Sequence, residues 1–245
     1  MKVVALIQAR MGSTRLPGKV LKPLCGRPVL AHVLERVHLC RRLDDVWVAT
    51  SNHSADDAIA NACRDWEVPC FRGSEDDVLD RFYSAANAAE AETVVRITAD
   101  CPLFDGWLLE DMLRVFTETN TPVVKVDYLS NVLERRYPRG LDAEIFTFAA
   151  LAQAHREAQQ PREREHVTPY IYGHPDIFRL YSYKGPEDWS HYRWTLDTPE
   201  DWALIEAIYQ ALYRPETPFT TQQVLDLLRS RPELAQINAT VQQKT

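Results

Sequence analysis

Two spacings of hydrophobic residues alternate along the first half of the chain. The continuous apolar run at 3–7 predicts a buried strand, because strands of a parallel sheet are covered on both faces. Apolar residues within 28–39 then recur at helical spacing, with Pro28 suited to the first turn. The same alternation predicts strands at 46–50, 68–71 and 93–99, and helices at 54–66, 77–91 and 107–117. This order implies right-handed crossovers and a mainly parallel sheet with helices on both faces.

The second half of the chain has a different organisation. Strand-like patterns at 123–129, 178–184 and 192–196 are separated by a polar, turn-rich stretch at 134–140. Helices are predicted at 146–159, from 162, at 199–213 and at 221–228. Side chains that can cap a helix stand at several predicted starts: Ser54, Thr198 (followed by Pro199) and Thr220 or Thr221. A length of 245 residues suits one large α/β domain.

Composition narrows the class of protein. With 45% hydrophobic and 26% charged residues, the chain is typical of soluble globular proteins. Five cysteines without a CxxC pair indicate free thiols in a reducing compartment, and no apolar run is long enough to cross a membrane. We therefore expect a cytoplasmic protein. The net charge of −7 argues against nucleic acid or an anionic membrane as a partner, but allows a local basic patch for a small phosphorylated ligand.

The segment after the first predicted strand has the chemistry that a triphosphate requires. Ligands bind at the carboxyl ends of strands in α/β sheets. Gly12 lets the backbone turn tightly and present amide groups to an anion. Further donors and positive charges follow within a few residues: Arg10, Ser13, Thr14, Arg15 and Lys19. A solvated basic loop is the simpler alternative, which three cations directly after a buried strand make less favourable.

Two familiar phosphate-binding loops are excluded. The pattern is not G-x-x-x-x-G-K-[ST], because Val20 follows Lys19, and it is not G-x-G-x-x-G, because the glycines stand at Gly12 and Gly18.

Five segments, in order, resemble the cytidylyltransferase family. The first spans 6–37, with LIQARMGSTRLPGK followed by Lys22-Pro23-Leu24, Gly26 and Pro28. The others are RITADCPL at 96–103, RGLDAE at 139–144, REHVTP at 164–169 and RWTLDTPED at 193–201. This family includes the CMP-Kdo and CMP-acylneuraminate synthetases and the spore-coat polysaccharide SpsF-like proteins, and the later segments are closest to the SpsF-like branch. The first segment is moderately specific, whereas all five in order are highly specific and cover most of the chain.

The resemblance implies a fold and a reaction. The fold is a three-layer α/β/α, nucleotide-diphospho-sugar-transferase-like (Rossmann-like) domain over 1–245, with a smaller subdomain at about 125–195 for acceptor binding and dimerisation. The reaction joins CMP from CTP to a small-molecule acceptor, forming a CMP-activated sugar or sugar acid with release of pyrophosphate. A homodimer that uses Mg²⁺ as its cofactor is implied. The residues implied to bind the nucleotide include Gln8, Ala9, Arg10, Met11, Gly12, Ser13, Thr14, Arg15 and Lys19, with Arg15 and Lys19 stabilising the leaving group.

Two carboxylates follow strand-like patterns and are implied to bind the metal. Asp100 follows the strand at 93–99, so its side chain is expected at the ligand crevice, and the resemblance makes it the main metal ligand and a catalytic residue. Capping explains Thr198 and its successors, but does not explain Asp197, where the family places a second metal-binding carboxylate. The sialate synthetases have a further acidic residue where this chain has Thr195, which leaves the number of metal ions open.

The base and the acceptor have less specific candidates. Arg72 or Arg81 could donate to the carbonyl of cytosine, although an exposed acidic turn explains the segment 72–81 equally well. Polar residues of the second half form a candidate acceptor pocket: Tyr137, Arg139, Asp142, Glu144, His166 and Arg193. A histidine at a helix start is more often structural, so His166 is given only a pocket role.

Three other functions are alternatives to the transfer of CMP to a sugar or sugar acid. A GT-A-like glycosyltransferase usually has a D-x-D metal motif, whereas Asp100 is followed by Cys101-Pro102. A non-catalytic nucleotide-binding module does not explain the joint presence of Arg10, Lys19, Asp100 and Asp197. A phosphonate acceptor remains open beside an ulosonic acid or another sugar, since related cytidylyltransferases act on phosphonates.

Overall fold

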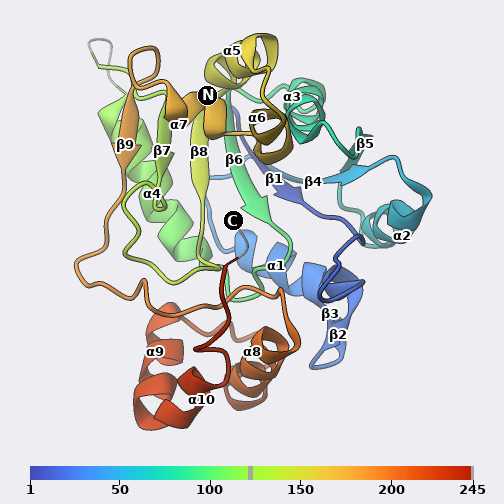
Figure 1. Ribbon diagram of the computed structural model, residues 1–245, viewed down its shortest axis with the longest axis vertical. Coiled ribbons are helices and arrows are strands. Elements are labelled where there is room, and N and C mark those ends of the chain that lie inside the picture. Colours follow the sequence, from blue (N-terminus) through green and yellow to red (C-terminus); the bar gives the residue numbers. More distant parts are fainter. Residues whose placement is uncertain (121–123, 244–245) are drawn as a thin grey trace.

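A seven-stranded sheet forms the centre of the computed structural model, which describes residues 1–120 and 124–243 (Figure 1). The strand order is β5-β4-β1-β6-β8-β7-β9, and β8 is the one strand of the seven that runs antiparallel to its neighbours. The bounds are β1 (Val3–Gln8), β4 (Asp45–Ser51), β5 (Cys70–Gly73), β6 (Thr93–Thr98), β7 (Tyr128–Ser130), β8 (Glu144–Thr147) and β9 (Leu180–Ser182). A small hairpin, β2 (Pro23–Leu24) and β3 (Arg27–Pro28), stands apart from this sheet.

Helices cover both faces of the sheet, as the alternating pattern predicts. In β1, Val3, Ala5 and Ile7 belong to one buried cluster, whereas Val4 and Leu6 belong to another. The first cluster includes residues of α1 (Val29–Val37), α2 (Asp57–Asp65), α4 (Gly106–Thr119), α8 (Pro199–Leu212), α9 (Thr221–Ser230) and α10 (Pro232–Gln236). The second includes residues of α3 (Val78–Ala88), α5 (Phe148–Glu157) and α7 (Pro169–Gly173), and α6 (Pro161–His166) packs beside α3. The three-layer, mostly parallel fold is therefore confirmed.

Most predicted elements occur within a few residues of their expected positions. The caps at Thr198 and Thr220 are confirmed, since each side chain accepts a backbone N–H of its helix. Ser54 as a cap is wrong: the side chain of His53 caps a short 3-10 helix, η2 (Ser54–Asp56), that precedes α2. The strand pattern at 123–129 corresponds to β7, and its first residue, Val123, lies outside the described residues.

Two predictions in the second half are wrong for a tertiary reason. The predicted helix at 146–159 begins at Phe148, because residues 144–147 pair with both β6 and β7 as the strand β8. The predicted strand at 192–196 is reduced to one isolated bridge between Arg139 and Arg193. Its alternation arises because Trp194 and Leu196 are buried in the core, without pairing to the sheet. No helix within 1–120 or 124–243 is both long and apolar enough to cross a membrane.

Gly140 is required where the polar stretch passes the segment before α8. Its φ is +104°, and a Cβ atom there would lie 2.5 Å from the carbonyl oxygen of Trp194. We expect Gly140→Ala to lower the free energy of unfolding by about 1–3 kcal/mol, since it adds strain and a backbone clash. The measurement is chemical denaturation.

The matched control is Gly173→Ala, because a Cβ atom at Gly173 meets nothing within 4 Å. This control is expected to change stability by no more than about 0.5 kcal/mol. Equal stability of the two variants would contradict the close approach at Gly140.

Candidate functional site

The loop that follows β1 is held in shape from two sides. The carbonyl oxygen of Met11 accepts the backbone N–H groups of Ser13 at 3.0 Å and of Gly18 at 3.2 Å, so the loop folds back on itself. The backbone N–H of Met11 donates to the buried carboxylate of Asp56 at 2.7 Å. The other oxygen of Asp56 accepts the Ser51 hydroxyl at 2.5 Å, which ties the loop to the end of β4. No local pattern indicates this role of Asp56, since it depends on a contact 45 residues away.

The two glycines of the loop have different uses. Gly18 has φ +66° and precedes the short 3-10 helix η1 (Lys19–Leu21), so it makes the turn that was predicted for Gly12. A Cβ atom at Gly12 would meet nothing within 4 Å, and Gly12 lines a cavity. Gly12 therefore leaves room for a ligand instead of making a tight turn.

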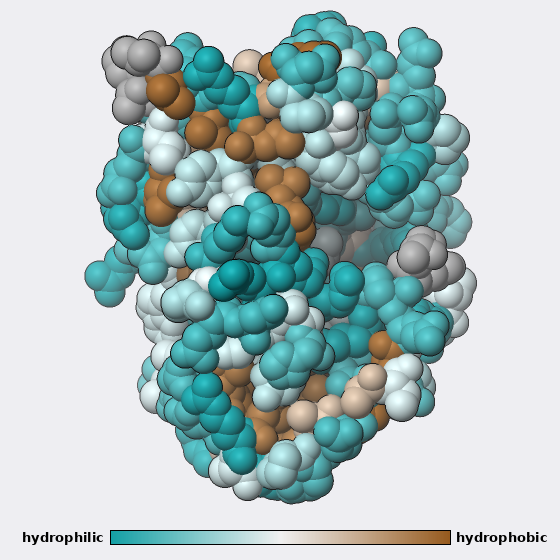
Figure 2. All heavy atoms as spheres, turned by 60° about the vertical axis from the view of Figure 1, so that its left-hand side comes forward, coloured by the Kyte–Doolittle hydropathy of each residue, from teal (hydrophilic) through white to brown (hydrophobic). Residues whose placement is uncertain are grey.

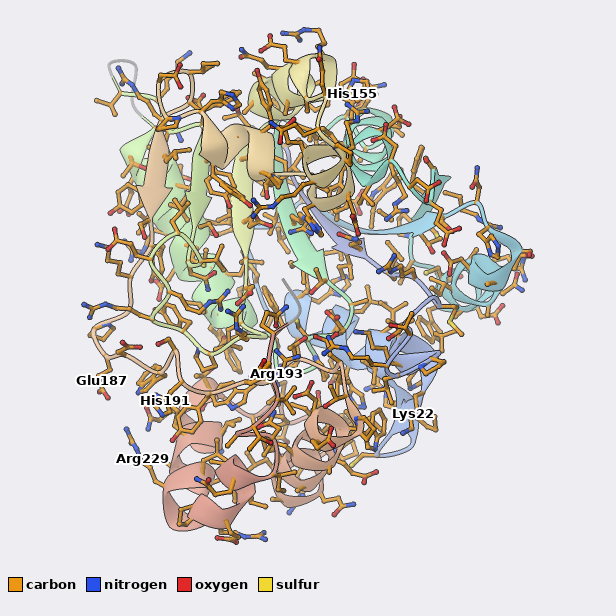
Figure 3. All side chains as sticks on the ribbon, in the orientation of Figure 1. Lys22, His155, Glu187, His191, Arg193 and Arg229 are labelled. Atoms are coloured by element: carbon orange, nitrogen blue, oxygen red, sulfur yellow. The ribbon has the colours of Figure 1, made fainter. Side chains whose placement is uncertain are left out.

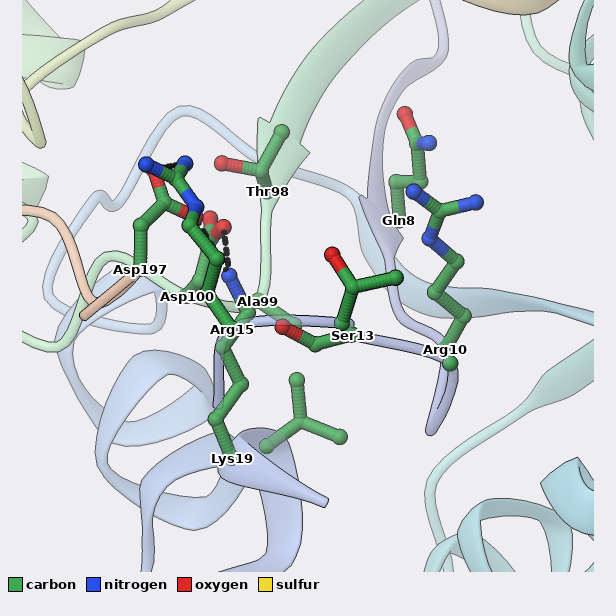
Figure 4. Close-up of a pocket in the computed structure, with 12 residues that line it drawn as sticks. Gln8, Arg10, Ser13, Arg15, Lys19, Thr98, Ala99, Asp100 and Asp197 are labelled. Atoms are coloured by element: carbon green, nitrogen blue, oxygen red, sulfur yellow. Dashed lines mark hydrogen bonds and ion pairs between the residues drawn. The ribbon is translucent and has the colours of Figure 1, made fainter. Parts of the chain in front are cut away.

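This cavity of about 340 Å³ lies at the carboxyl ends of β1 and β6. In Figure 4, Lys19, Arg15, Asp100 and Asp197 gather on one side, and Gln8 and Arg10 stand on the other, with Ser13 between them. The cavity brings together most of the residues predicted to bind nucleotide and metal, and adds Val20, Thr98 and Ala99. Its lining residues are Gln8, Arg10, Gly12, Ser13, Thr14, Arg15, Lys19, Val20, Thr98, Ala99, Asp100 and Asp197.

The Lys19 ammonium joins the two predicted metal ligands. Its Nζ donates to Asp100 Oδ2 at 2.7 Å, to Asp197 Oδ1 at 2.8 Å and to the carbonyl oxygen of Leu196 at 2.6 Å. Burial by itself lowers the pKa of Lys19, but the neighbouring charges of Asp100 and Asp197 outweigh it and raise this pKa above its ordinary value of 10.5. Burial by itself raises the pKa of Asp197, but Lys19 and Arg193 outweigh it and hold this pKa below its ordinary value of 3.8. Lys19 and Asp197 therefore both carry their charges at neutral pH.

A buried network supports Asp197 from behind. Arg193 donates through Nη2 to Asp197 Oδ2 at 2.8 Å and through Nε to Asp201 Oδ1 at 2.9 Å, and Asp201 is fully buried. Asn238 Nδ2 completes the set by donating to the Arg193 carbonyl and to Asp201. Figure 3 shows Arg193 in the interior of the molecule, unlike the surface pair Glu187 and Arg229. Arg193, predicted for the acceptor, thus orients a carboxylate of the first cavity.

A second cavity of about 360 Å³ lies beside the first and shares Thr98 with it. It contains four of the six residues predicted for the acceptor: Arg139, Asp142, Glu144 and His166. Arg135, which the sequence analysis did not single out, also lines this cavity. Its guanidinium donates two hydrogen bonds, of 2.6 and 2.8 Å, to the carboxylate of Asp142. Within 1–120 and 124–243, the guanidinium of Arg139 has no hydrogen bond or ion pair. One guanidinium therefore faces this cavity without a direct protein partner.

Arg96 on β6 connects the two cavities. Its Nη1 pairs with Glu144 Oε2, and its Nη2 donates to Gln8 Oε1 at 3.1 Å. The other oxygen of Glu144 accepts the hydroxyls of Tyr128 at 2.6 Å and Thr168 at 2.5 Å. These hydrogen bonds fix the wall between the cavities.

Several predicted residues lie outside both cavities. Arg72 donates to the carbonyl oxygens of Ser51 and His53, and Arg81 is 1% exposed, with burial lowering its pKa to about 10. The side chain of Tyr137 is buried against Tyr183 and Trp189. The loop residues Ala9 and Met11 are also absent from the cavity walls.

A third hollow of about 410 Å³ lies over α8 to α10. Figure 2 shows exposed hydrophobic side chains at the height of these helices, among hydrophilic ones. Arg139 and Gln243 border both this hollow and the second cavity.

Comparison with known proteins supports this description. Residues 4–226 match a family described as cytidylyltransferase. The chain is 38% identical to an uncharacterised protein, MJ1063, of Methanocaldococcus jannaschii, over 100% of this chain and 98% of that protein. It is 34% identical to the spore coat polysaccharide biosynthesis protein SpsF of Bacillus subtilis, over 95% of this chain and 96% of that protein. A 3-deoxy-manno-octulosonate cytidylyltransferase of Geobacter sulfurreducens is 32% identical, over 54% of this chain and 51% of that protein.

A solved structure has the same fold over the whole length. The structure of a cytidylyltransferase from Leptospira borgpetersenii superimposes with a TM-score of 0.90 and 33% identity, covering 100% of this chain and 99% of that one. The family match extends from β1 through α8 and includes the loop and both carboxylates. This chain therefore belongs to the cytidylyltransferase family of nucleotidyltransferases.

Proposed function

We propose that this chain transfers CMP from CTP to a small anionic sugar or sugar acid, with Mg²⁺ as cofactor and release of pyrophosphate. The observation that carries the proposal is the first cavity, where three cations and two convergent carboxylates line one space at the ends of β1 and β6. The second cavity adjoins it at Thr98, as a two-substrate transfer requires.

The two carboxylates fit a magnesium ion that arrives with a nucleotide. Asp100 Oδ2 and Asp197 Oδ1 lie 2.7 and 2.8 Å from one atom, Lys19 Nζ, so they converge on one point. Within 1–120 and 124–243 no group of three or more His, Cys, Asp or Glu side chains could hold a metal. Mg²⁺ commonly binds one or two carboxylates and takes its remaining ligands from phosphates and water. When bound here, it would neutralise charge that develops on the α-phosphate.

The chain's own groups supply position and charge. The hydroxyls of Ser13 and Thr14, with Arg10 and Arg15, line the cavity where the phosphates would lie. An acceptor oxygen forms a bond to the α-phosphorus, while the bond from that phosphorus to the bridging oxygen breaks and pyrophosphate leaves. Negative charge grows on the leaving group, and the loop cations stabilise it there. No covalent enzyme intermediate is needed.

The second cavity supports an anionic acceptor with hydroxyl groups. Burial, followed by the charge of Arg135, lowers the pKa of Arg139, yet an arginine remains cationic at neutral pH. Its free guanidinium can pair with a carboxylate or phosphonate, while Asp142, Glu144 and His166 offer partners for hydroxyls. The names of the SpsF and octulosonate relatives agree with a sugar or sugar acid.

Nucleotide choice gives the first test. We expect CTP with Mg²⁺ to raise the melting temperature more than GTP, UTP or UDP-sugars do, because only the bound nucleotide stabilises the folded state. Differential scanning fluorimetry measures this directly. Stabilisation by GTP or UDP-sugars, but not by CTP with Mg²⁺, would contradict the cytidylyl assignment.

Asp100→Asn tests the first cavity. We expect pyrophosphate release from CTP and an acceptor to fall at least about 100-fold, since one of the two convergent carboxylates loses its charge. The matched control is Asp111→Asn, which neutralises an exposed carboxylate on α4 with 60% of its side chain accessible, and it should retain wild-type turnover. Equal activity of both variants would refute the role of Asp100.

Arg139→Gln tests the second cavity. The acceptor for this test is any compound that causes pyrophosphate release from CTP in a screen of ulosonic acids and phosphonates. Loss of one charge-assisted bond should raise the KM for the acceptor about 10- to 100-fold, without changing the Kd for CTP. Arg136→Gln is the control, because Arg136 is an exposed arginine three residues away. An unchanged acceptor KM would exclude Arg139 from acceptor binding.

A further inference from the structure

The ammonium of Lys19 stands where the two carboxylates converge, and it is fully engaged there. An ammonium has three donor hydrogens, and Lys19 Nζ has three acceptors: Asp100, Asp197 and the Leu196 carbonyl oxygen. Only 8% of this residue is exposed. In this state Lys19 has no hydrogen left for a phosphate, although the loop that carries it lines the cavity.

Lys19 and a divalent cation cannot occupy this point together. Mg²⁺ binds carboxylate oxygens at about 2.0–2.1 Å. The Nζ atom is within 2.8 Å of one oxygen from each carboxylate, on the side where the two oxygens converge. A metal that used both oxygens would overlap the ammonium and repel its charge. A metal held by both of these oxygens can therefore bind only after the ammonium has moved away.

The two carboxylates differ in the partners that they keep when Lys19 moves away. Asp197 keeps Arg193 at 2.8 Å and Arg15 at 3.4 Å. Asp100 has no other ion pair within the described parts of the chain, and its second oxygen accepts only the Cys101 thiol, at 3.5 Å. Departure of the ammonium thus leaves Asp100 without a counter-charge. Because such a carboxylate is costly in a partly buried site, the departure of Lys19 favours another cation in its place.

The nucleotide supplies the reason for the exchange. A triphosphate in the cavity brings several negative charges next to the loop, and Lys19 has a long, flexible stem with rotatable donors. We propose that Lys19 is an internal counter-cation that keeps Asp100 and Asp197 closed to divalent cations until the nucleotide binds, when Lys19 turns from the carboxylates to the phosphates. This inference rests on the proposed function for the identity of the nucleotide. Metal and nucleotide then bind cooperatively, each strengthening the other by the same factor.

The test measures metal binding without nucleotide or turnover. Mn²⁺ serves as the probe, and the electron paramagnetic resonance signal of free Mn²⁺ reports how much is bound. We expect nucleotide-free wild-type protein to bind Mn²⁺ weakly, and Lys19→Met to bind it at least about tenfold more tightly, within the usual range of coupling between sites. The double variant Lys19→Met with Asp100→Asn should lose this gain, because it also removes the carboxylate that the loss of Lys19 makes available to the metal.

Arg10→Met is the matched control. It removes one positive charge from the same cavity, but Arg10 has no ion pair with either carboxylate in the described parts of the chain. Its Mn²⁺ affinity should change much less than that of Lys19→Met. Equal affinity of these two variants, or wild-type binding as tight as that of Lys19→Met, would overturn the proposal.

Lys19→Gln provides a second variant if the methionine destabilises the fold. Mn²⁺ should raise its melting temperature more than that of wild type, because a ligand of the folded state stabilises it. No such difference would also overturn the proposal. Failure of the proposed function is distinguishable: tighter Mn²⁺ binding by Lys19→Met without any CTP turnover in wild type would refute the reaction alone. Turnover in wild type without the gain would refute the exchange alone.

Discussion

The ion pairs of Lys19 connect three parts of the chain that are far apart in sequence. Its ammonium bonds Asp100, 81 residues away, and Asp197, 178 residues away. These contacts join the loop after β1 to the end of β6 and to the segment before α8. Two carboxylates that face each other in a partly buried site need a cation between them. The shape of the first cavity depends on this one charge compensation.

A second layer of buried polar groups holds one of these carboxylates, Asp197, in place. Asp201 is fully buried and accepts hydrogen bonds from Arg193, Asn238 and the backbone N–H of Asp197. Such a network is stable because every member has partners, and losing one would leave a buried charge uncompensated. Asp56 has the same role beneath the loop, where it binds the Met11 backbone. The polar groups that define the site are thus fixed by polar groups that do not line it.

The two adjoining cavities follow from one strand. Strand β6 lies between β1 and β8, so Arg96 can reach Gln8 on one side and Glu144 on the other, while Thr98 borders both cavities. The antiparallel β8 brings Glu144 into this position, although the polar segment around it has no strong strand pattern. A parallel sheet alone would supply the nucleotide site; its antiparallel extension contributes the walls of the second cavity.

The sequence by itself determined the elements and the chemistry of the loop. The apolar spacing of the first half, the capping residues Thr198 and Thr220, and the carboxylates Asp100 and Asp197 are local signals, and local signals specify local structure. Only the tertiary structure decided that Lys19 lies between these carboxylates and that 144–147 is a strand. It also placed Arg193 behind Asp197 and moved Arg72, Arg81 and Tyr137 out of the cavities. The physical reason is that side-chain pairing depends on strand order and register, which join residues too distant for any periodicity to record.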